Sequence, residues 1–440
     1  MEHSCGLTFL AMLLANRFGR ATIIAGATLL ISLLLVILAQ SADLRSHLPS
    51  SPSIWPAKEC SAPALAESRT NISYDLTVPP SVGCEDIVND LQQKLIQAYS
   101  KSLRGVRYAN IWGYLETENK GDAAIWSAQQ ILMSMLGIEM MEACRFMDRD
   151  CDIKRFRKVL EDHRPNSAII MAGGGNFNDY YWEDQPSRMK MIESFTNVSI
   201  RAFPQSVYMT NPERIKATEE AFGKHKDLQL AARDKPSYDW LDKTFGNKEG
   251  IDSHLVPDIA FMWGNRSDFR VNGKKTHDIL ILARKDMEIS DGDSSNIEFG
   301  EGELDLGEGV GKVTYQKVDW KFTQTPDIDP PKASGDEANG SPAAPKRENG
   351  KNQRAWAKAI AGFELLGSAR FVITDRLHGH ILSTLIGVPH VLMDSKLGKN
   401  LNFHNTWTRD CECTRIAFSI EQALDVARLY FEKENKAVQT

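Results

Sequence analysis

An arginine and a histidine stand two residues apart in the segment Thr374-Asp375-Arg376-Leu377-His378-Gly379-His380. Arginine binds carboxylates and phosphates through two parallel N–H donors, and histidine can transfer a proton near neutral pH. The segment follows the run 370–373 and precedes apolar residues at helical spacing, which predicts a strand, a turn and a helix beginning near Leu377. The free N–H groups of such a helix bind anions, so the sequence predicts an anion site beside a proton donor. A turn whose Arg376 and His378 only cap the helix or form salt bridges is the alternative.

Further motifs are predicted at the carboxyl ends of strands, where parallel sheets bind ligands. The glycine-rich loop 171–179 lacks the lysine of a P-loop and the spacing of a dinucleotide site. Arg233 and Arg284 each end a strand, although Arg233 could instead form a surface pair with Asp234. Asp122 begins the first helix and could simply cap it. The residues predicted to line a cleft are Gly121, Asp122, Gly174, Gly175, Asn176, Gln205, Ser206, Arg284 and Lys399.

Strand and helix patterns alternate along most of the chain, which predicts parallel sheets with helices on both faces. A first α/β domain is expected over 83–272, with strands at 107–112, 167–171, 199–203, 228–231 and 254–256. A second is expected over 273–436, with strands at 279–283, 371–374 and 389–393 and helices at 354–366, 377–386 and 419–432. The acidic, glycine-rich stretch at about 287–351 is predicted to be a largely disordered insertion, in which 313–318 could form a strand and Trp320 could anchor one end.

The N-terminal region predicts a single membrane anchor. Residues 21–39 carry no charge and are long enough to span a bilayer. Arg17 and Arg20 precede them, which favours a cytosolic tail at 1–20 and a lumenal remainder. A stem rich in Ser, Pro and Ala follows at 40–82. A cleaved signal peptide ending near Ala39 is the alternative.

Other features agree with a lumenal location. Six of the 7 cysteines follow the anchor, and N-x-S sequons occur at Asn71, Asn197, Asn265 and Asn339. We predict disulfides between Cys60 and Cys84 and between Cys144 and Cys151. The chain has no second Cys or His pair at metal spacing, so no zinc site is predicted. A net charge of -6 and the lack of a basic stripe argue against nucleic acid as a partner.

Together and in this order, the motifs resemble those of the polysaccharide pyruvyl transferase family. The resemblance spans about residues 105–410 and rests on the segments 119–122, 173–177, 203–206, 232–234, 257–258, Arg284 with Asp286, 374–379, 387–389 and 398–399. It implies two Rossmann-like domains that face each other across a cleft, as in GT-B glycosyltransferases. Asn178 stands where the family usually has glycine, which favours a less open glycine loop. The anchor and stem resemble those of fungal Golgi members that act on galactose of N-glycans.

Carried onto this chain, the resemblance implies that His378 is the general acid and that Arg233, Arg376 and Leu377 bind the donor, phosphoenolpyruvate. The acid would protonate the methylene carbon of the donor, and two hydroxyls of a sugar, expected to be terminal galactose, would join its C2 as a cyclic ketal. This scheme requires no cofactor and no metal. Two other function classes stay open, namely a nucleotide-sugar glycosyltransferase of similar architecture and a catalytically silent carbohydrate-binding relative.

Overall fold

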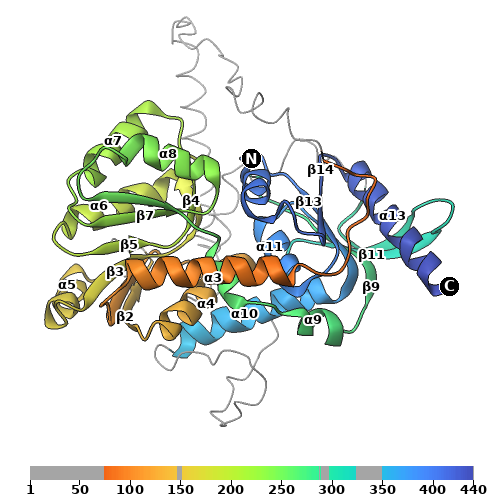
Figure 1. Ribbon diagram of the computed structural model, residues 1–440, viewed down its shortest axis with the longest axis horizontal. Coiled ribbons are helices and arrows are strands. Elements are labelled where there is room, and N and C mark those ends of the chain that lie inside the picture. Colours follow the sequence, from red (N-terminus) through yellow and green to blue (C-terminus); the bar gives the residue numbers. More distant parts are fainter. Residues whose placement is uncertain (1–73, 146–150, 287, 289–296, 324–348, 440) are drawn as a thin grey trace, which may run out of the picture. The chain divides into compact units, whose positions relative to one another are not determined.

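The computed structural model describes residues 74–145, 151–286, 288, 297–323 and 349–439. These residues belong to one compact unit, in which two β-sheets with flanking helices lie side by side (Figure 1). The first sheet takes its strands from residues 108–255 and the second from residues 277–417. The predicted α/β class is therefore confirmed. The predicted boundary at 272–273 lies in the chain between the last strand of the first sheet and the first strand of the second.

The first sheet has the strand order β2-β1-β3-β5-β7-β6-β4, with β8 paired to β7, and its pairs are parallel. Its strands are β1 (Tyr108–Trp112), β2 (Glu139–Cys144), β3 (Ser167–Met171), β4 (Gly174–Asn178), β5 (Ile200–Ala202), β6 (Gln205–Tyr208), β7 (Leu228–Ala232) and β8 (Ile251–Leu255). The helices of this half are α3 (Glu85–Ser102), α4 (Lys120–Met135), α5 (Ile153–Asp162), η2 (Trp182–Asp184), α6 (Gln185–Ser194), α7 (Pro212–Phe222), α8 (Lys235–Phe245), η3 (Ile259–Trp263) and α9 (Ser267–Asn272).

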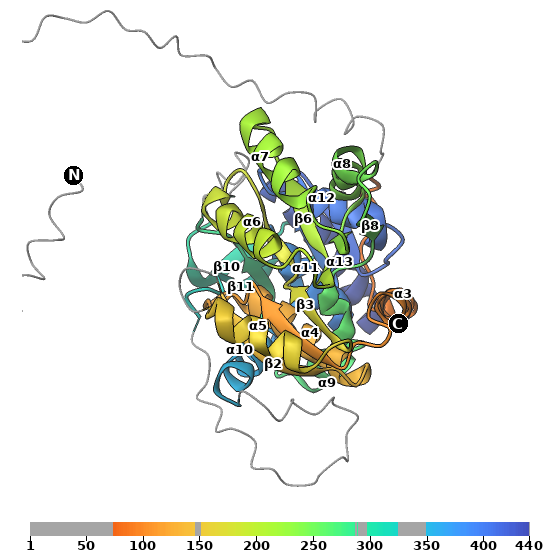
Figure 2. The same cartoon turned by 90° about the vertical axis from the view of Figure 1, so that its left-hand side faces the viewer.

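Helices cover both faces of this sheet (Figure 2). Successive strand residues point to opposite faces, and in β3 both Ile169 and Ile170 are fully buried. Ile169 belongs to a hydrophobic cluster with residues of α5, α6, α7 and α8, whereas Ile170 belongs to another cluster with residues of α3, α4 and η3. A strand buried on both faces reads as a continuous apolar run, which is why β3 was predicted correctly from sequence.

The second sheet has the order β10-β11-β9-β12-β13-β14, parallel except for the antiparallel pair of β10 and β11. Its strands are β9 (His277–Leu282), β10 (Gly300–Asp305), β11 (Lys312–Val318), β12 (Ala369–Thr374), β13 (His390–Met393) and β14 (Thr414–Ala417). The helices of this half are α10 (Asn349–Gly367), α11 (Leu377–Ile386), α12 (Lys399–Phe403), the π-helix η4 (His404–Thr408) and α13 (Ile420–Gln439).

Two segments differ from the sequence prediction. The glycine-rich segment forms the short strand β4 instead of a loop, because β4 pairs with β6. Residues 297–323, placed in a largely disordered insertion, form β10, β11 and a turn in which Trp320 is buried. The predicted strand at 313–318 is thus confirmed as part of β11. Residues 287, 289–296 and 324–348 of the predicted insertion lie outside the described residues.

A single hydrophobic cluster connects the two halves. It contains buried residues of α3, α4 and η3 from the first half together with residues of α10 and α11 from the second. At this junction Trp263 of η3 packs on Trp356 of α10 with ring centroids 4.4 Å apart. Because the two halves share one core, the loops at their facing strand ends are held in a fixed relation.

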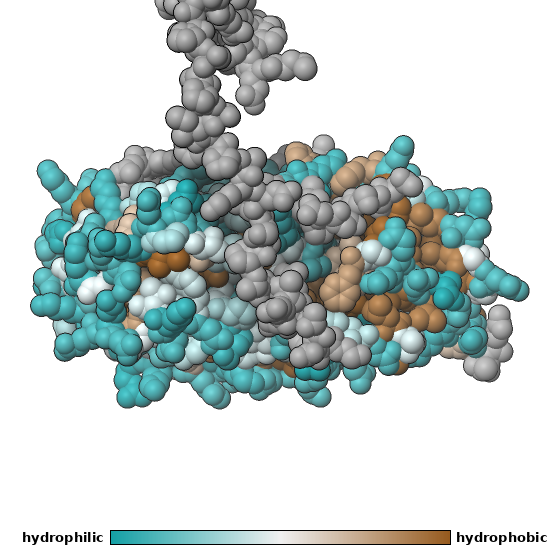
Figure 3. All heavy atoms as spheres, turned by 90° about the horizontal axis from the view of Figure 1, so that it is seen from above, coloured by the Kyte–Doolittle hydropathy of each residue, from teal (hydrophilic) through white to brown (hydrophobic). Residues whose placement is uncertain are grey.

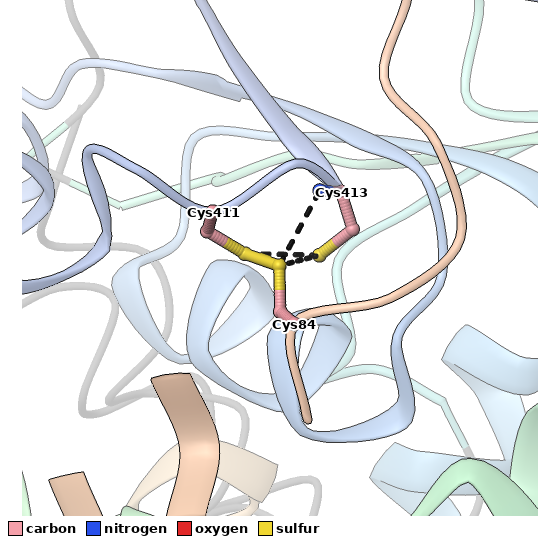
Figure 4. Close-up of side chains that lie close together, drawn as sticks. All are labelled: Cys84, Cys411 and Cys413. Carbon is pink, nitrogen blue, oxygen red and sulfur yellow. Dashed lines mark hydrogen bonds between the residues drawn. A yellow bond between two sulfur atoms is a disulfide. The ribbon is translucent and has the colours of Figure 1, made fainter. Parts of the chain in front are cut away.

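The disulfides correct one prediction and confirm another. Cys144 is bonded to Cys151 as predicted, but Cys84 is bonded to Cys411 and not to Cys60, which lies outside the described residues. Residues 74–84 run beside the C-terminal half, where the Ser81 amide donates to the Glu412 carbonyl at 2.9 Å. This path brings Cys84 next to Cys411 across 327 residues of sequence, a proximity that spacing alone does not reveal. The buried thiol of Cys413 lies 3.3 Å from both bonded sulfurs (Figure 4).

Within the described residues, no helix has both the length and the apolar character needed to cross a membrane. The predicted anchor at 21–39, the tail at 1–20 and the stem up to residue 73 lie outside those residues. The face in Figure 3 is mostly hydrophilic, with its main hydrophobic area on the side of the second sheet.

Candidate active site

A cavity of about 510 Å³, lined by many polar and charged residues, opens where the strand ends of the two halves meet. Its wall combines the N-termini of α4 and α11, the strand β4, and the turn that follows β11. The lining residues are Leu115, Thr117, Glu118, Asn119, Asp122, Gly175, Asn176, Tyr181, Asp184, Arg233, Arg284, Glu288, Trp320, Lys321, Phe322, Arg376, Leu377, His378 and Lys399.

Most residues predicted from sequence line this cavity. Four of the cleft candidates do not line it, namely Gly121, Gly174, Gln205 and Ser206. Gln205 is buried and donates to the Ala172 carbonyl at 2.6 Å. Gly174 has a φ of +142°, a conformation that favours glycine, and an added Cβ would lie 4.0 Å from Cδ1 of Ile125. Gly121 and Ser206 contact the predicted catalytic and donor-binding residues, as described below.

His378 lies in the first turn of α11, the helix that begins directly after the strand β12. No side chain caps this helix, because Arg376 at the N-cap position makes no capping hydrogen bond. The positive end of the helix dipole, with its free N–H groups, therefore faces the cavity beside His378. The ring Nε2 of His378 is 3.4 Å from Oδ2 of Asp258, a carboxylate that is 0 % exposed.

Asp258 joins the histidine to the first arginine. Its Oδ2 also accepts a hydrogen bond from Nη1 of Arg233 at 2.7 Å. Burial alone would raise the pKa of Asp258, but the adjacent His378 and Arg233 hold it well below its usual value. Asp258 is therefore an anion at neutral pH, and it fixes one side of the imidazole and one side of the guanidinium.

Arg233 is buried and held on two sides. Its Nε donates to Oγ of Ser206 at 2.9 Å, and Ser206 in turn donates to Asp234 at 2.6 Å. Within the described part of the chain, none of the hydrogen bonds of Arg233 uses Nη2, which points at the face of Gly175. A Cβ on Gly175 would lie 2.8 Å from this nitrogen. The alternative of a surface pair between Arg233 and Asp234 is wrong, because Asp258 is the ion-pair partner.

Arg376 is also buried, and its partner comes from the turn after β11. Its Nη2 donates to Oδ2 of Asp319 at 2.6 Å, whereas its Nε has no hydrogen-bond partner among the described residues. The turn itself is attached to α4, because Nζ of Lys120 donates to the carbonyls of Trp320 at 2.5 Å and Thr323 at 2.7 Å. Burial lowers the pKa of Lys120 to about 8. Lys120, which belongs to the first half, therefore fixes the turn after β11, which the second half contributes to the cavity wall.

A second cationic group, Arg284 with Lys399, lines the same cavity. Nη2 of Arg284 and Nζ of Lys399 both contact Oε2 of Glu288, and the hydroxyl of Tyr181 donates to its Oε1 at 3.0 Å. Burial lowers the pKa of Lys399 to about 8. Arg284 also donates to Asp286 at 2.8 Å. The cations of this group are therefore oriented by carboxylates before any ligand arrives.

The glycine-rich segment is fixed by a side chain and is not a flexible loop. Asn178, which stands where we expected the family to have glycine, donates to the Gly175 carbonyl at 2.7 Å. Its Oδ1 accepts from the amides of Tyr180 and Tyr181 at 2.9 and 3.0 Å. Asn178 thereby holds the bare Cα of Gly175 against Arg233.

Sequence reasoning missed several residues of the site. Asp258 and Lys120 lie inside motifs that we quoted, and a carboxylate directly after a strand is the signal that could have identified Asp258. Asp319 and Glu288 fall in the stretch that composition marks as an insertion, so no sequence signal pointed to them. Asn119, and not Asp122, caps α4, since its side chain accepts from the Gly121 amide at 3.0 Å.

Comparison with known proteins agrees with this geometry. The family model described as polysaccharide pyruvyl transferase matches residues 87–396. The chain is 31% identical over 352 residues to pyruvyl transferase 1 of Schizosaccharomyces pombe, across 79% of this chain and 82% of that protein. It is 32% identical over 254 residues to EpsO of Bacillus subtilis, provisionally named a pyruvyl transferase, across 57% and 73%. General stress protein 30 of Bacillus subtilis is 23% identical over 311 residues, across 69% and 79%. We conclude that the chain is a transferase and belongs to the polysaccharide pyruvyl transferase family.

Proposed function

We propose that this protein transfers the pyruvyl group of phosphoenolpyruvate to two hydroxyls of one glycan sugar and forms a cyclic ketal. The observation that carries the proposal is the set of unused donors around His378. Arg376 Nε and Arg233 Nη2 have no protein acceptor among the described residues, and the N-terminus of α11, which begins directly after Arg376, has no side-chain cap. A small molecule with both a carboxylate and a phosphate fits such a set.

Each buried cation has a task in donor binding. A guanidinium can hold two oxygens of one anion, so Arg376 and Arg233 can each hold one end of phosphoenolpyruvate. Lys399 lies beside Arg233 at Gly175, with its Nζ 3.6 Å from the position of a Cβ there. It can neutralise charge on the leaving phosphate. Leu377 would face the apolar methylene of the donor.

The proton transfer falls to His378. Ketal formation begins when an acid protonates the methylene carbon, which leaves a cationic centre at C2 for a sugar hydroxyl to attack. The carboxylate of Asp258 lies 3.4 Å from Nε2 and keeps the ring oriented. The scheme uses no metal and no cofactor, because His378 supplies the proton and the cations supply the charge.

The acceptor and the location are proposals that rest on sequence. We propose terminal galactose as the acceptor sugar, because the predicted anchor and stem resemble those of fungal members acting on that sugar. The same features support a Golgi membrane location with the folded unit in the lumen. We also propose, from the family resemblance, that the two halves are Rossmann-like and arranged as in GT-B glycosyltransferases. The two sheets on either side of the cavity support this.

The test is to incubate the full-length protein with phosphoenolpyruvate and a β-galactoside, and to measure ketal product by mass spectrometry together with released phosphate. We expect product from the wild type and a loss of about 10²-fold or more for His378→Ala, with the protein still folded. His277→Gln is the matched control, because His277 lies outside the cavity, where its ring contacts the Thr276 hydroxyl at 3.0 Å and the exposed Glu301 at 3.6 Å. It should keep wild-type activity.

Donor binding separates this proposal from a nucleotide-sugar glycosyltransferase. Phosphoenolpyruvate should raise the melting temperature, and UDP- or GDP-sugars should not. Arg376→Lys should weaken the apparent donor affinity, because an ammonium cannot form the two parallel bonds of a guanidinium. Stabilisation by a nucleotide sugar and not by phosphoenolpyruvate would overturn the proposal.

A further inference from the structure

The cavity wall carries four carboxylates, and three of them face cations. Glu118 pairs with Lys358 at 2.7 Å, and Glu288 contacts both Lys399 and Arg284. Asp184 accepts from the Asn176 side chain at 2.8 Å and interacts electrostatically with Arg188. The fourth carboxylate is Asp122. Among the described residues no Lys, Arg or His lies within ion-pair distance of it.

Among the described residues, one hydrogen bond orients the carboxylate of Asp122 and leaves its second oxygen free to bind a ligand. The hydroxyl of Thr117 donates to its Oδ2 at 2.8 Å, and Oδ1 has no partner among the described residues. Asn119 already caps α4, so Asp122 is not needed for that structural role. An unpaired carboxylate with one fixed and one open oxygen, in a cavity that otherwise balances its charges, is suited to accept hydrogen bonds from a neutral polyol.

Asp122 also lies next to the proposed acid. Its neighbour Gly121 is so close to His378 that an added Cβ would be 2.7 Å from the histidine Cβ. The N-termini of α4 and α11 therefore meet face to face, one bearing Asp122 and the other His378. Phe322, 73% exposed, lines the same cavity and offers an aromatic face on which a sugar ring can stack.

We infer that Asp122 is a further catalytic residue, which binds the hydroxyl pair of the acceptor and accepts a hydroxyl proton. The inference rests on the proposed function and adds the acceptor side of the site to it. A carboxylate has two oxygens and can receive both hydroxyls of a diol, which is the group that a cyclic ketal consumes. The structure thus assigns the donor to the arginines and the diol to Asp122.

The proton balance closes with these two residues. His378 gives its proton to the methylene carbon, and the first hydroxyl oxygen bonds to C2 while its proton passes to Asp122. The second hydroxyl oxygen then bonds to C2, and the bond from C2 to the phosphate oxygen breaks with its electron pair on phosphate. The proton of the second hydroxyl returns to His378, and the proton on Asp122 leaves with the phosphate. Two hydroxyl protons are lost, one is gained by the methyl group, and one by phosphate.

The experiment compares the kinetics of Asp122→Asn with those of Glu116→Gln in the full-length protein. Asparagine keeps the shape of the side chain, but it replaces one acceptor oxygen with an NH2 donor and cannot accept the proton. We expect kcat with the β-galactoside to fall about 10²- to 10⁴-fold, with phosphoenolpyruvate stabilising the variant as it does the wild type. Glu116 lies on the same segment, outside the cavity, and pairs with Arg354 at 2.6 Å, so its variant should behave as wild type.

Three readouts decide the matter. A lower kcat with unchanged donor binding and unchanged melting temperature supports the assignment. A kcat for Asp122→Asn within about threefold of wild type overturns it and leaves the proposed function intact, since the wild type still makes ketal. A large loss of melting temperature or donor binding in the variant would also overturn it, because Asp122 would then be structural or part of the donor site. If the wild type makes no ketal from any galactoside, the proposed function itself is wrong.

Discussion

Replacing Gly121 with alanine is a sharp test of how the two halves build one site. The added methyl group would lie 2.7 Å from Cβ of His378 and 2.8 Å from its Cγ and Nδ1. Ordinary van der Waals contact begins near 3.4 Å, so the methyl group intrudes by about 0.7 Å. Cβ of His378 is attached directly to the backbone of α11, whose neighbouring residues are buried. Rotation of the imidazole leaves Cβ in place, so it cannot relieve this contact.

The size of the effect follows from this displacement. A misplacement of about 1 Å at a reacting group costs about 10²-fold in rate, so we expect kcat to fall about 10- to 100-fold for Gly121→Ala. The overpacked contact should cost about 1–3 kcal/mol, partly offset by the roughly 1 kcal/mol that alanine gains over glycine in a helix. The protein should therefore remain folded, with a slightly lower melting temperature.

The assay measures kcat from phosphate release at saturating donor and acceptor, and the melting temperature in parallel. Gly350→Ala is the matched control, because it adds the same methyl group to α10, where the nearest atom is the flexible end of Arg354 at 3.3 Å. It should keep the wild-type kcat. If Gly121→Ala also retains a kcat within about twofold of wild type, the contact between the two helix N-termini is wrong, and so is the assignment built on it.

Three other changes test separate parts of the structure. Gly175→Ala should raise the KM for phosphoenolpyruvate about 10-fold or more with little loss of stability, because the methyl group would displace Nη2 of Arg233, and an unchanged KM would contradict this. Cys84→Ser should lower the free energy of unfolding by about 2–5 kcal/mol, since it opens a disulfide that closes 327 residues, and chemical denaturation measures this. Burial lowers the pKa of His390 to about 4 against the opposing effect of its hydrogen bond to the Val388 carbonyl, so this histidine is neutral when folded and stability should fall as the pH drops below about 6.5. The expected loss is about 2 kcal/mol by pH 5, and a melting temperature that is constant over this range would contradict it.

Elements with a clear local pattern of apolar residues could be predicted from the sequence. Strands that form only because they pair with a neighbouring strand could not. Strand β3 and helix α11 have the predicted bounds, 167–171 and 377–386, because apolar runs and helical spacing are local signals. Strand β4 has a glycine-rich sequence with low strand propensity, and it becomes a strand because β6 lies beside it. Strand β10 is similar, since its Gly and Glu residues are ordered by antiparallel pairing with β11.

The site divides in the same way. Cations such as Arg233 and Arg376 could be found from sequence, because a parallel sheet places all of its strand ends at one edge. Their carboxylate partners could not, since Asp258 pairs with Arg233 across 25 residues and Asp319 pairs with Arg376 across 57. Asp319 also lies in a stretch whose composition is typical of disorder, and the turn is ordered by contacts with residues distant in sequence, among them Lys120 and Arg376.

Each cation proposed to bind the donor is paired with a buried carboxylate, and this has a consequence for how the donor would be recognised. Arg233, Arg376 and Lys399 have their positive charges largely compensated by Asp258, Asp319 and Glu288 before a ligand binds. An isolated buried cation would be costly, so compensation lets these buried cations stay charged and fixed. Net positive charge is then a weak basis for selecting a ligand, and the directions of the unused N–H groups become the stronger one. A donor must place oxygens at Arg376 Nε, at Arg233 Nη2 and at the N-terminus of α11 together, which favours a short molecule bearing a carboxylate and a phosphate over an extended diphosphate.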